Sequence, residues 1–290
     1  MLFVDRSDGS RVRGLEAIKA VLPYVLRRRS ESSVFFSRDV EVEGAMAYLR
    51  RKNSEVGGER YSLFGVLVAA AVRTIAMKPR LNRFVHRRAV YARKGISVSF
   101  IVKKSLTEAS SEVNAKIRFE AEDDLERATA KINAGIEAAR SGPSDRGYGR
   151  FRPYLNLPLF KATISNLFRV LDRFNIAPRR MIEADPLFSS VYFANLGSIG
   201  LDPPYHQLYD WGTASVFMVV GRIFQKDAPR SGDEPRGNGA GRRHFVTVKF
   251  TVDERIADGL YFAHAVSLFQ RLVSRPESLE AAPDLSEAEA

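Results

Sequence analysis

The stretch Asp253-Glu254-Arg255-Ile256-Ala257-Asp258-Gly259 decides the fold that this sequence predicts. Before it, apolar residues take every second position over 246–252, which is the period of a β-strand. After it, apolar residues recur at helical spacing over 262–273, and Pro276 ends the helix. Carboxylates and an arginine therefore lie at a strand-to-helix corner. Rigid elements on both sides hold such side chains in place, so the corner is a candidate site for chemistry.

Outward from this corner, helical and strand patterns are mixed along the whole chain. Helical spacing covers 14–29, 43–52, 63–77, 123–140 and 157–174, and strand patterns cover 34–42, the region of Tyr91, 96–102, 112–120, 190–195 and 215–223. The segment 63–77 is apolar nearly all round, which predicts a buried helix, and Ser62 is its expected N-cap. Because strands and helices do not alternate strictly, we expect an α+β fold with a mixed sheet flanked by helices.

Composition predicts one globular domain. The chain has 290 residues, of which 45% are hydrophobic and 27% charged, enough for a sizeable core. We interpret 1–276 as this domain, with flexible loops near 141–150 and 225–243, and 277–290 as an acidic, disordered tail. The absence of cysteine excludes disulfides, thiolate metal sites and a cysteine nucleophile, and is typical of a reducing compartment.

The net charge, the start of the chain and its apolar runs bear on three classes of partner: membranes, nucleic acids and coenzyme A. The start lacks the layout of a signal peptide, and the longest apolar run is about half of what a membrane span needs, so we expect a cytoplasmic protein without a membrane partner. A net charge of +11 raises the possibility of nucleic-acid binding, but the basic residues are spread out and do not interleave with aromatic residues. Nucleic acid is therefore not the favoured partner. A few of these cations could equally meet the phosphates of coenzyme A.

Four stretches of the sequence resemble one known family. They are the buried helix with Pro79-Arg80-Leu81-Asn82, the strand over 96–102, the turn Asn195-Leu196-Gly197 with the strand that holds Val219-Val220-Gly221-Arg222, and the corner over 253–259. In this order and spacing they resemble the catalytic domain of the dihydrolipoamide acyltransferases of 2-oxo acid dehydrogenase complexes. That family belongs to the chloramphenicol-acetyltransferase-like superfamily.

The resemblance implies a fold, an assembly and a substrate. It implies a chloramphenicol-acetyltransferase-like mixed sheet flanked by helices and assembled as a homotrimer. The family's active sites lie in a channel between subunits, which coenzyme A enters from one side and the acyl partner from the other. No lipoyl-bearing domain or swinging linker precedes the domain in this sequence, so we expect a free-standing protein without a covalently bound lipoyl group. No spacing of His, Asp and Glu predicts a metal site.

The sequence departs from the family at two positions that carry chemistry. Glu254 stands where the family's signature has the histidine that removes a proton from the attacking thiol or hydroxyl. Ala194 stands where the family has a Ser or Thr that stabilises the oxyanion. The family's other residues are retained as Asn195, Arg255 and Asp258, the last of which orients the site. Asp258 is also a plausible helix N-cap.

The replacement of the base has an energetic cost. Proton transfer from a thiol of pKa ~8.5 to a free carboxylate of ~4.3 is uphill by roughly 5.7 kcal/mol, against roughly 2.7 kcal/mol for a free imidazole of ~6.5. A carboxylate base therefore needs an apolar environment, which Ile256 and Ala257 could supply. Losing one oxyanion donor costs about 10²–10³ in rate.

The histidines and the single tryptophan are further candidates for the site. His206 follows the Asn195 turn in a region that approaches the channel in the family, so it is a second candidate base. We expect His264 to be a packing or surface residue, and His86 and His244, which lie among arginines, to be solvated. Trp211 is expected to pack beside the turn rather than to stack on a substrate.

Two functions remain open. The first is a coenzyme A-dependent acyltransferase, with small-molecule acyl donor and acceptor, in which Glu254, Asp258, Asn195 and His206 form the site. The second is a non-catalytic trimeric relative that binds acyl-CoA or acts as a scaffold, because the catalytic histidine and the oxyanion hydroxyl are lost together.

Overall fold

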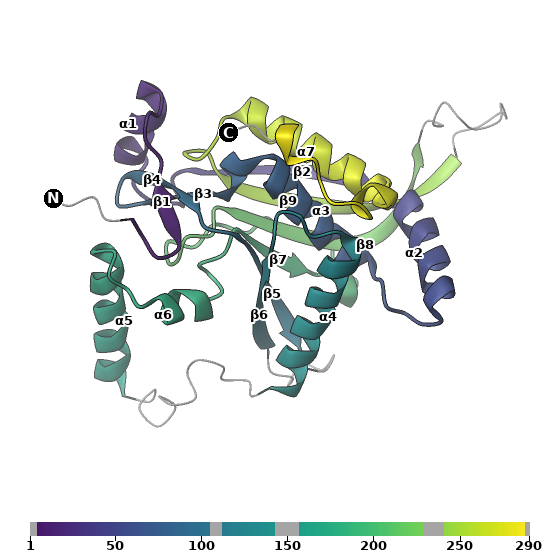
Figure 1. The fold of residues 1–290 in the computed structure, drawn as a ribbon, viewed down its shortest axis with the longest axis horizontal. Helices are drawn as coiled ribbons and strands as arrows, with labels where there is room; N and C mark the ends of the chain where they lie inside the picture. The colour runs from purple at the N-terminus through teal and green to yellow at the C-terminus, as the bar shows by residue number, and fades with distance from the viewer. Residues whose placement is uncertain (1–4, 105–111, 143–156, 229–240, 288–290) are drawn as a thin grey trace.

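A six-stranded mixed sheet forms the centre of the molecule in the computed structural model, which describes residues 5–104, 112–142, 157–228 and 241–287 (Figure 1). In spatial order its strands are β2 (Ser33–Glu41), β9 (Gly241–Asp253), β8 (Val216–Ala228), β7 (Val191–Asn195), β5 (Ile96–Lys103) and β6 (Glu112–Phe119). Strand β7 runs parallel to both of its neighbours, and the other pairs are antiparallel. The expected α+β fold with a mixed sheet is confirmed.

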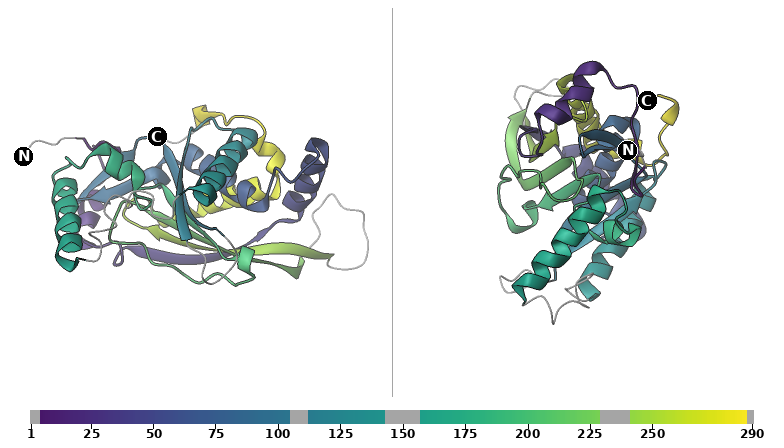
Figure 2. Two further views of the ribbon diagram at one scale, coloured as in Figure 1. Left: turned by 90° about the horizontal axis from the view of Figure 1, so that it is seen from below. Right: turned by 90° about the vertical axis from the view of Figure 1, so that its left-hand side faces the viewer.

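Helices cover one face of this sheet (Figure 2). They are α2 (Glu43–Val56), α3 (Leu63–Met77), α4 (Leu125–Ser141) and α7 (Gly259–Ser274). Helix α3 lies at the centre of the core and buries 11 of its 15 residues, as its all-round apolar pattern predicted. The Ser62 hydroxyl accepts the Gly65 N–H at 3.1 Å and so caps this helix.

The opposite face of the sheet is covered by the loop that follows β7. Tyr192, Phe217 and Val219 form a second apolar cluster there, together with Leu208 from the loop. The short 3₁₀ helix Gly197–Ile199 begins this loop. The face away from the helices is thus partly apolar, and it carries the end of β7 where the family-like turn lies.

A smaller unit closes one end of the molecule (Figure 1). It has a three-stranded sheet, in the order β1 (Gly9–Arg11), β4 (Ala89–Arg93) and β3 (Arg83–His86). Strand β3 directly follows the 3₁₀ helix Pro79–Asn82. Helices α1 (Ala17–Val25), α5 (Pro158–Arg173) and α6 (Arg179–Ala184) lie at the same end. Phe168 and Trp211 stack with their ring centroids 5.3 Å apart, which ties α5 to the loop before β8.

Two glycines let the turn Asn195-Leu196-Gly197 lie close to β8. A Cβ on Gly197 would lie 2.4 Å from the Gly221 carbonyl oxygen, and a Cβ on Gly221 would lie 2.3 Å from Pro203 Cδ. Only glycine permits this close approach of the turn to β8. The register of β8 against β9 also shifts between Val220 and Ile223.

Several predicted boundaries were wrong. The helix expected over 14–29 is the shorter α1, which contains Pro23 in its last turn. The loop expected over 225–243 is shorter, because Gln225 pairs with His244 and Ala228 with Gly241, which extends the β8–β9 hairpin. The loop expected near 141–150 lies outside the described residues apart from its first two positions.

The acidic tail, which the structure describes as far as Glu287, also differs from the prediction. It forms the 3₁₀ helices Pro276–Leu279 and Leu285–Glu287. Leu279 is buried, and the Tyr48 hydroxyl donates to a Glu280 carboxylate oxygen at 2.8 Å. The tail was predicted to be disordered from its composition. Its buried leucine and its polar contacts, which include the ion pair of Glu280 with Lys52 at 2.7 Å, hold it against α2.

Candidate functional site

The corner after β9 is held by a buried ion pair. Asp253 accepts two hydrogen bonds from the Arg255 guanidinium, at 2.7 Å from Nε and 2.6 Å from Nη2. Arg255 Nη1 donates to the Leu26 carbonyl at 2.9 Å, and both charged side chains are buried. Because a bidentate pair is rigid, these two residues fix the turn and leave Glu254 between them.

Glu254 is the carboxylate of the turn that remains available. Its backbone N–H donates to the Ser32 carbonyl at 3.0 Å, and its side chain is half-buried. Within the described ranges, no ion pair or side-chain hydrogen bond engages its carboxylate. Ile256 and Ala257 belong to the main core cluster beneath the helices. A carboxylate in this state can accept a proton or orient a nucleophile.

Asp258 has a structural role at the start of α7. Its side chain accepts the Tyr261 N–H at 2.9 Å, which is the N-cap contact. That backbone hydrogen bond, aided by Lys19 and Arg80, holds the pKa of Asp258 below its ordinary value. Asp258 therefore stays ionised at neutral pH and fixes the helix that follows Glu254.

Asn195 and Ala194 lie at the end of β7 that is remote from Glu254. Asn195 pairs with Val220, which pairs with Val248 on β9. Glu254 follows Val248 by six positions, so the two lie about 20 Å apart along the strands. Within one chain, therefore, the predicted residues do not form one site.

His206 lies over the sheet face that also carries Ala194. Its ring stacks on Phe217 with centroids 4.0 Å apart, and its Nδ1 and Nε2 lie 2.6 Å from the Gln207 carbonyl and 3.2 Å from the Tyr209 hydroxyl. No described contact joins His206 to Glu254. His206 stays a candidate on the Asn195 side of the site.

For the tryptophan and the other histidines, the structure confirms some of the predicted surroundings and contradicts others. Trp211 was expected to pack beside the turn, but its ring stacks on Phe168 of α5, and its Nε1 donates to Asp185 at 2.6 Å. His264 is exposed, as expected of a surface residue. The prediction that His86 and His244 are solvated was wrong. His244 Nδ1 lies 2.7 Å from Glu43 Oε2 and is half-buried.

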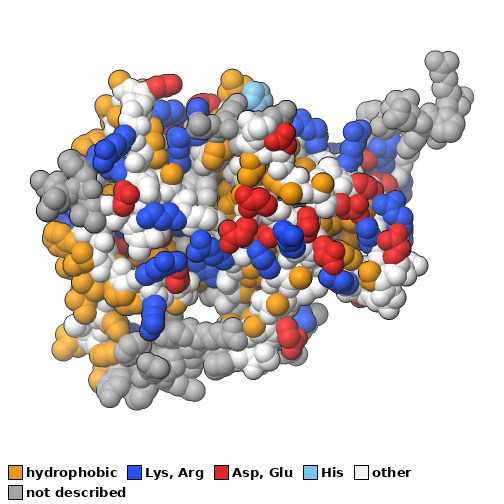
Figure 3. All heavy atoms as spheres, in the orientation of Figure 1, with side chains coloured by type: hydrophobic (Ala, Val, Ile, Leu, Met, Phe, Trp, Pro, Cys, Tyr) orange, Lys and Arg blue, Asp and Glu red, His pale blue; other side chains and the backbone are white. Residues whose placement is uncertain are grey.

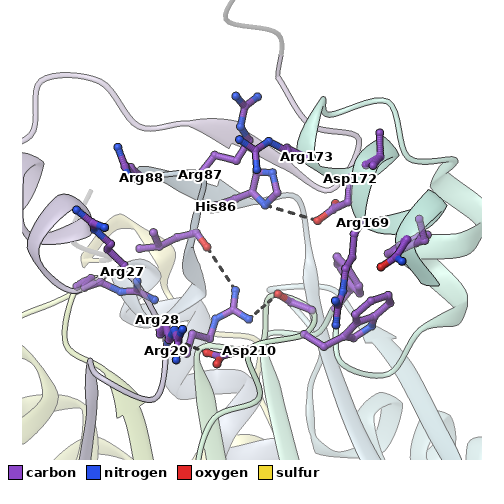
Figure 4. A pocket seen from close by; sticks show the side chains of 18 residues that line it. Arg27, Arg28, Arg29, His86, Arg87, Arg88, Arg169, Asp172, Arg173 and Asp210 are labelled. Atoms are coloured by element: carbon purple, nitrogen blue, oxygen red, sulfur yellow. Dashed lines mark hydrogen bonds and ion pairs between the residues drawn. The ribbon is translucent and has the colours of Figure 1, made fainter. Parts of the chain in front are cut away.

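A cavity of about 780 Å³ opens beside the corner (Figure 4). We call it the arginine cavity, because arginines make up eight of its 18 lining residues, namely Arg27, Arg28, Arg29, Arg87, Arg88, Arg169, Arg173 and Arg255. They come from the segment after α1, the β3–β4 turn, α5 and the corner itself. The sequence showed these residues as separate basic runs, and no local pattern indicated that they meet.

His86 and Arg29 form part of the wall of the arginine cavity. The His86 side chain is 12% exposed, and burial together with Arg6 and Arg29 lowers its pKa to about 3. Burial lowers the pKa of Arg29 to about 10, so Arg29 keeps its charge at neutral pH. Arg29 donates to three backbone carbonyls, of Val85, Tyr209 and Gly212.

The described part of the chain has neither a metal-binding cluster nor a membrane-spanning helix. No cluster of three or more His, Asp or Glu side chains there could hold a metal ion. Among the same residues, no helix combines the length and apolar character needed to cross a membrane.

Solved structures of acetyltransferases share this fold at low sequence identity. A probable dihydrolipoamide acetyltransferase from Listeria monocytogenes matches with a TM-score of 0.56 and 13% identity, over 92% of this chain and 95% of its own. The dihydrolipoamide acetyltransferase of Azotobacter vinelandii matches with a TM-score of 0.58 and 12% identity, over 93% and 94%. A chloramphenicol acetyltransferase matches with a TM-score of 0.54 and 14% identity, over 92% and 98%. No protein-family model and no curated protein sequence matches this chain significantly.

These matches establish the fold on which the corner stands. The chain has the chloramphenicol-acetyltransferase-like fold, as the resemblance implied. In the Azotobacter vinelandii enzyme the catalytic mechanism has been investigated at a serine, a histidine and an asparagine, and the last two are four positions apart. Glu254 and Asp258 have the same spacing in this chain.

Proposed function

We propose that this protein is a divergent member of the dihydrolipoamide acyltransferase family that transfers an acyl group from a coenzyme A thioester to a small-molecule acceptor. The observation that carries the proposal is the corner after β9. Its frame is retained by the buried Asp253–Arg255 pair and the Asp258 cap, and Glu254 is the one carboxylate of the turn without a partner among the described residues. It stands on a fold that solved acetyltransferases share over more than nine-tenths of this chain.

In the proposed reaction, Glu254 is the general base. It takes the proton of an acceptor thiol or hydroxyl as the acceptor's sulfur or oxygen attacks the thioester carbonyl carbon. The oxyanion that forms is held by Asn195 and neighbouring backbone N–H groups of a second copy, in place of the missing hydroxyl at Ala194. Collapse breaks the carbon–sulfur bond, and Glu254 gives the acceptor's former proton to the leaving coenzyme A thiolate.

The proposed site requires two copies of the chain, and we propose a homotrimer. Glu254 and Asn195 are separated by about six residues, or about 20 Å, along the strands. This separation supports an assembly in which Glu254 of one copy meets Asn195 of another. Exposed apolar side chains support it too, because they gather over the end of the molecule that carries α1 and α5 (Figure 3). Among them, Ile18 is 62% and Val25 66% exposed on α1, and Leu167 is 55% exposed on α5.

Release of the coenzyme A thiol tests the proposal directly. Because the chain contains no cysteine, every thiol detected with a chromogenic reagent comes from the substrate. The assay pairs a panel of acyl-CoAs with alcohol acceptors. Transfer to a thiol acceptor leaves the total of free thiols unchanged, so it is followed instead by chromatographic separation of free coenzyme A from acyl-CoA. Glu254→Gln should lower acceptor-dependent turnover by about 10² or more, the typical contribution of a general base. Glu254→His, which restores the family's base, should retain turnover. An equal rate for Glu254→Gln and the native protein contradicts the proposal.

The non-catalytic alternative rests on a separate observation, the joint loss of the family's histidine at Glu254 and hydroxyl at Ala194. In that case the native protein binds acyl-CoA without releasing thiol. The double variant Ala194→Ser, Glu254→His separates the two functions. A native protein without turnover, beside a double variant that gains it, assigns the chain to the acyl-CoA binders. Turnover by the native protein that Glu254→Gln removes assigns it to the enzymes.

A further inference from the structure

The two aspartates of the arginine cavity are already engaged by the protein. Asp172 lies 2.8 Å from Arg6 Nη2 and 3.6 Å from His86 Nδ1. Asp210 accepts the backbone N–H of Arg29 at 3.1 Å. Among the described residues, neither carboxylate forms an ion pair with the arginines at the rim of the cavity.

Most of the lining arginines carry an unbalanced charge. Glu31 accepts the backbone N–H groups of Arg27 and Arg28 at 3.0 and 3.2 Å, not their guanidinium groups. Across the described ranges of the chain, seven guanidinium groups that line the cavity have no ion pair with a carboxylate. Arg29 is one of them and donates to backbone carbonyls, and the other six are Arg27, Arg28, Arg87, Arg88, Arg169 and Arg173. Figure 4 shows that they surround the cavity from three sides. Like charges held this close repel one another, and a bound anion removes that cost.

Aromatic rings hold three of these arginines in place. Arg87 lies over Phe174 at 5.8 Å, Arg88 over Tyr24 at 5.5 Å and Arg169 over Trp211 at 5.4 Å, measured from the guanidinium carbon to the ring centroid. Stacking occupies the face of a guanidinium and leaves its in-plane N–H donors for another partner. Those donors match the oxygens of a phosphate group.

The β3–β4 turn places two of these arginines at a conformational cost. Arg87 and Arg88 are its two central residues, between the paired His86 and Ala89, and their φ angles are 48° and 64°. Both lie in the left-handed region, which two-residue hairpin turns normally fill with Asn-Gly. Arginine at both positions is locally unfavourable, and a ligand-binding role of the side chains explains it.

We infer that the arginine cavity binds a small molecule that carries two or more phosphate groups. Six unbalanced guanidinium groups on three walls exceed what one phosphate can engage, and the volume lies within the range of about 300–1,000 Å³ for small-ligand pockets. The inference does not depend on acyl transfer. The phosphates could belong to the nucleotide half of coenzyme A or to a separate phosphorylated molecule, and the experiment distinguishes these sources.

Calorimetric titration of the full-length protein with inorganic pyrophosphate at low salt tests the inference. The native protein should bind pyrophosphate with a dissociation constant below about 1 mM. The turn variant Arg87→Asn, Arg88→Gly should bind at least about tenfold more weakly yet melt at a higher temperature, because Asn-Gly suits the turn. Arg169→Gln, Arg173→Gln changes the opposite wall and should weaken binding similarly.

A matched control removes two charges elsewhere. Arg50→Gln, Arg140→Gln alters exposed arginines on α2 and α4, outside the cavity, and should leave binding within about twofold of native. Absence of pyrophosphate binding, or equal weakening by control and cavity variants, overturns the inference. So does a folded turn variant with native affinity.

Competition identifies the source of the phosphates. If coenzyme A displaces pyrophosphate and pantetheine, which has no phosphate, does not, the cavity takes the nucleotide half of coenzyme A. If pyrophosphate binds and coenzyme A does not displace it, the cavity serves a separate phosphorylated ligand. Either result supports the inference, and neither uses acyl transfer as a readout.

Discussion

At the scale of single residues, the corner after β9 contains three carboxylates with three different states. Asp253 is bound to the Arg255 guanidinium, and Asp258 caps a helix. Glu254 makes neither kind of contact within the described ranges. The sequence placed all three at one corner, but it could not say which is free, since that depends on neighbours from other segments, such as Ser32 and Leu26.

His86 should make the protein sensitive to acid. The charged groups around it are the carboxylates of Asp8 and Asp172 and the guanidinium groups of Arg6, Arg29 and Arg87. Burial is the main reason that its pKa falls from 6.5 to about 3. Below pH 6.5 the unfolded chain binds a proton that the folded chain does not, so stability falls as the pH falls toward 3. At pH 5 the loss from this group is about 2 kcal/mol.

Urea unfolding at pH 7 and pH 5 checks this value. Between the two, the native protein should lose about 2 kcal/mol more than His86→Gln, because other titrating groups act on both proteins alike. Equal losses would show that His86 takes up its proton as readily in the folded state as in the unfolded state.

At the scale of elements, the stability of α7 depends on its cap. Asp258→Ala removes the acceptor of the Tyr261 N–H and should lower the free energy of unfolding by about 1 kcal/mol, whereas Asp258→Asn keeps the acceptor and should cost a few tenths. Chemical denaturation of both variants measures the difference. If Asn is as costly as Ala, charge rather than capping is the contribution of Asp258.

Elements with local signals were predicted well from the sequence. Helix α3 has an all-round apolar pattern and a Ser62 cap, and both act within a few residues. The extended part of the β8–β9 hairpin was missed because its polar residues have no strand period of their own. Gln225 and Ala228 become strand residues only through pairing with His244 and Gly241.

At the scale of the whole molecule, α1 presents an apolar face that the described residues of its own chain leave exposed. Pro23 is its only buried residue, while Ile18 and Val25 are 62% and 66% exposed. We expect a second copy to cover this face in the proposed trimer. The native protein should therefore have three times the 32.5 kDa chain mass by light scattering, and Ile18→Lys, Val25→Lys should shift it toward monomer.

A matched variant controls for the added charge. Val56, at the end of α2, is 45% exposed and lies far along the chain from α1, so Val56→Lys should leave the mass unchanged. A native protein that is monomeric, or a trimer that survives the α1 double variant, would contradict the assignment of α1 to the interface.

By itself the sequence determined the α+β class, the buried central helix and the strand-to-helix corner, because periodicity, caps and turn glycines act locally along the chain. The placement of Glu254 and Ala194 at positions on which the family's chemistry depends stays a prediction from the sequence. Only the tertiary structure decided that Glu254 and Asn195 lie far apart along the strands and that distant arginine runs surround one cavity. The physical reason is that spacing along the chain does not set distance in space, whereas strand register and helix packing do.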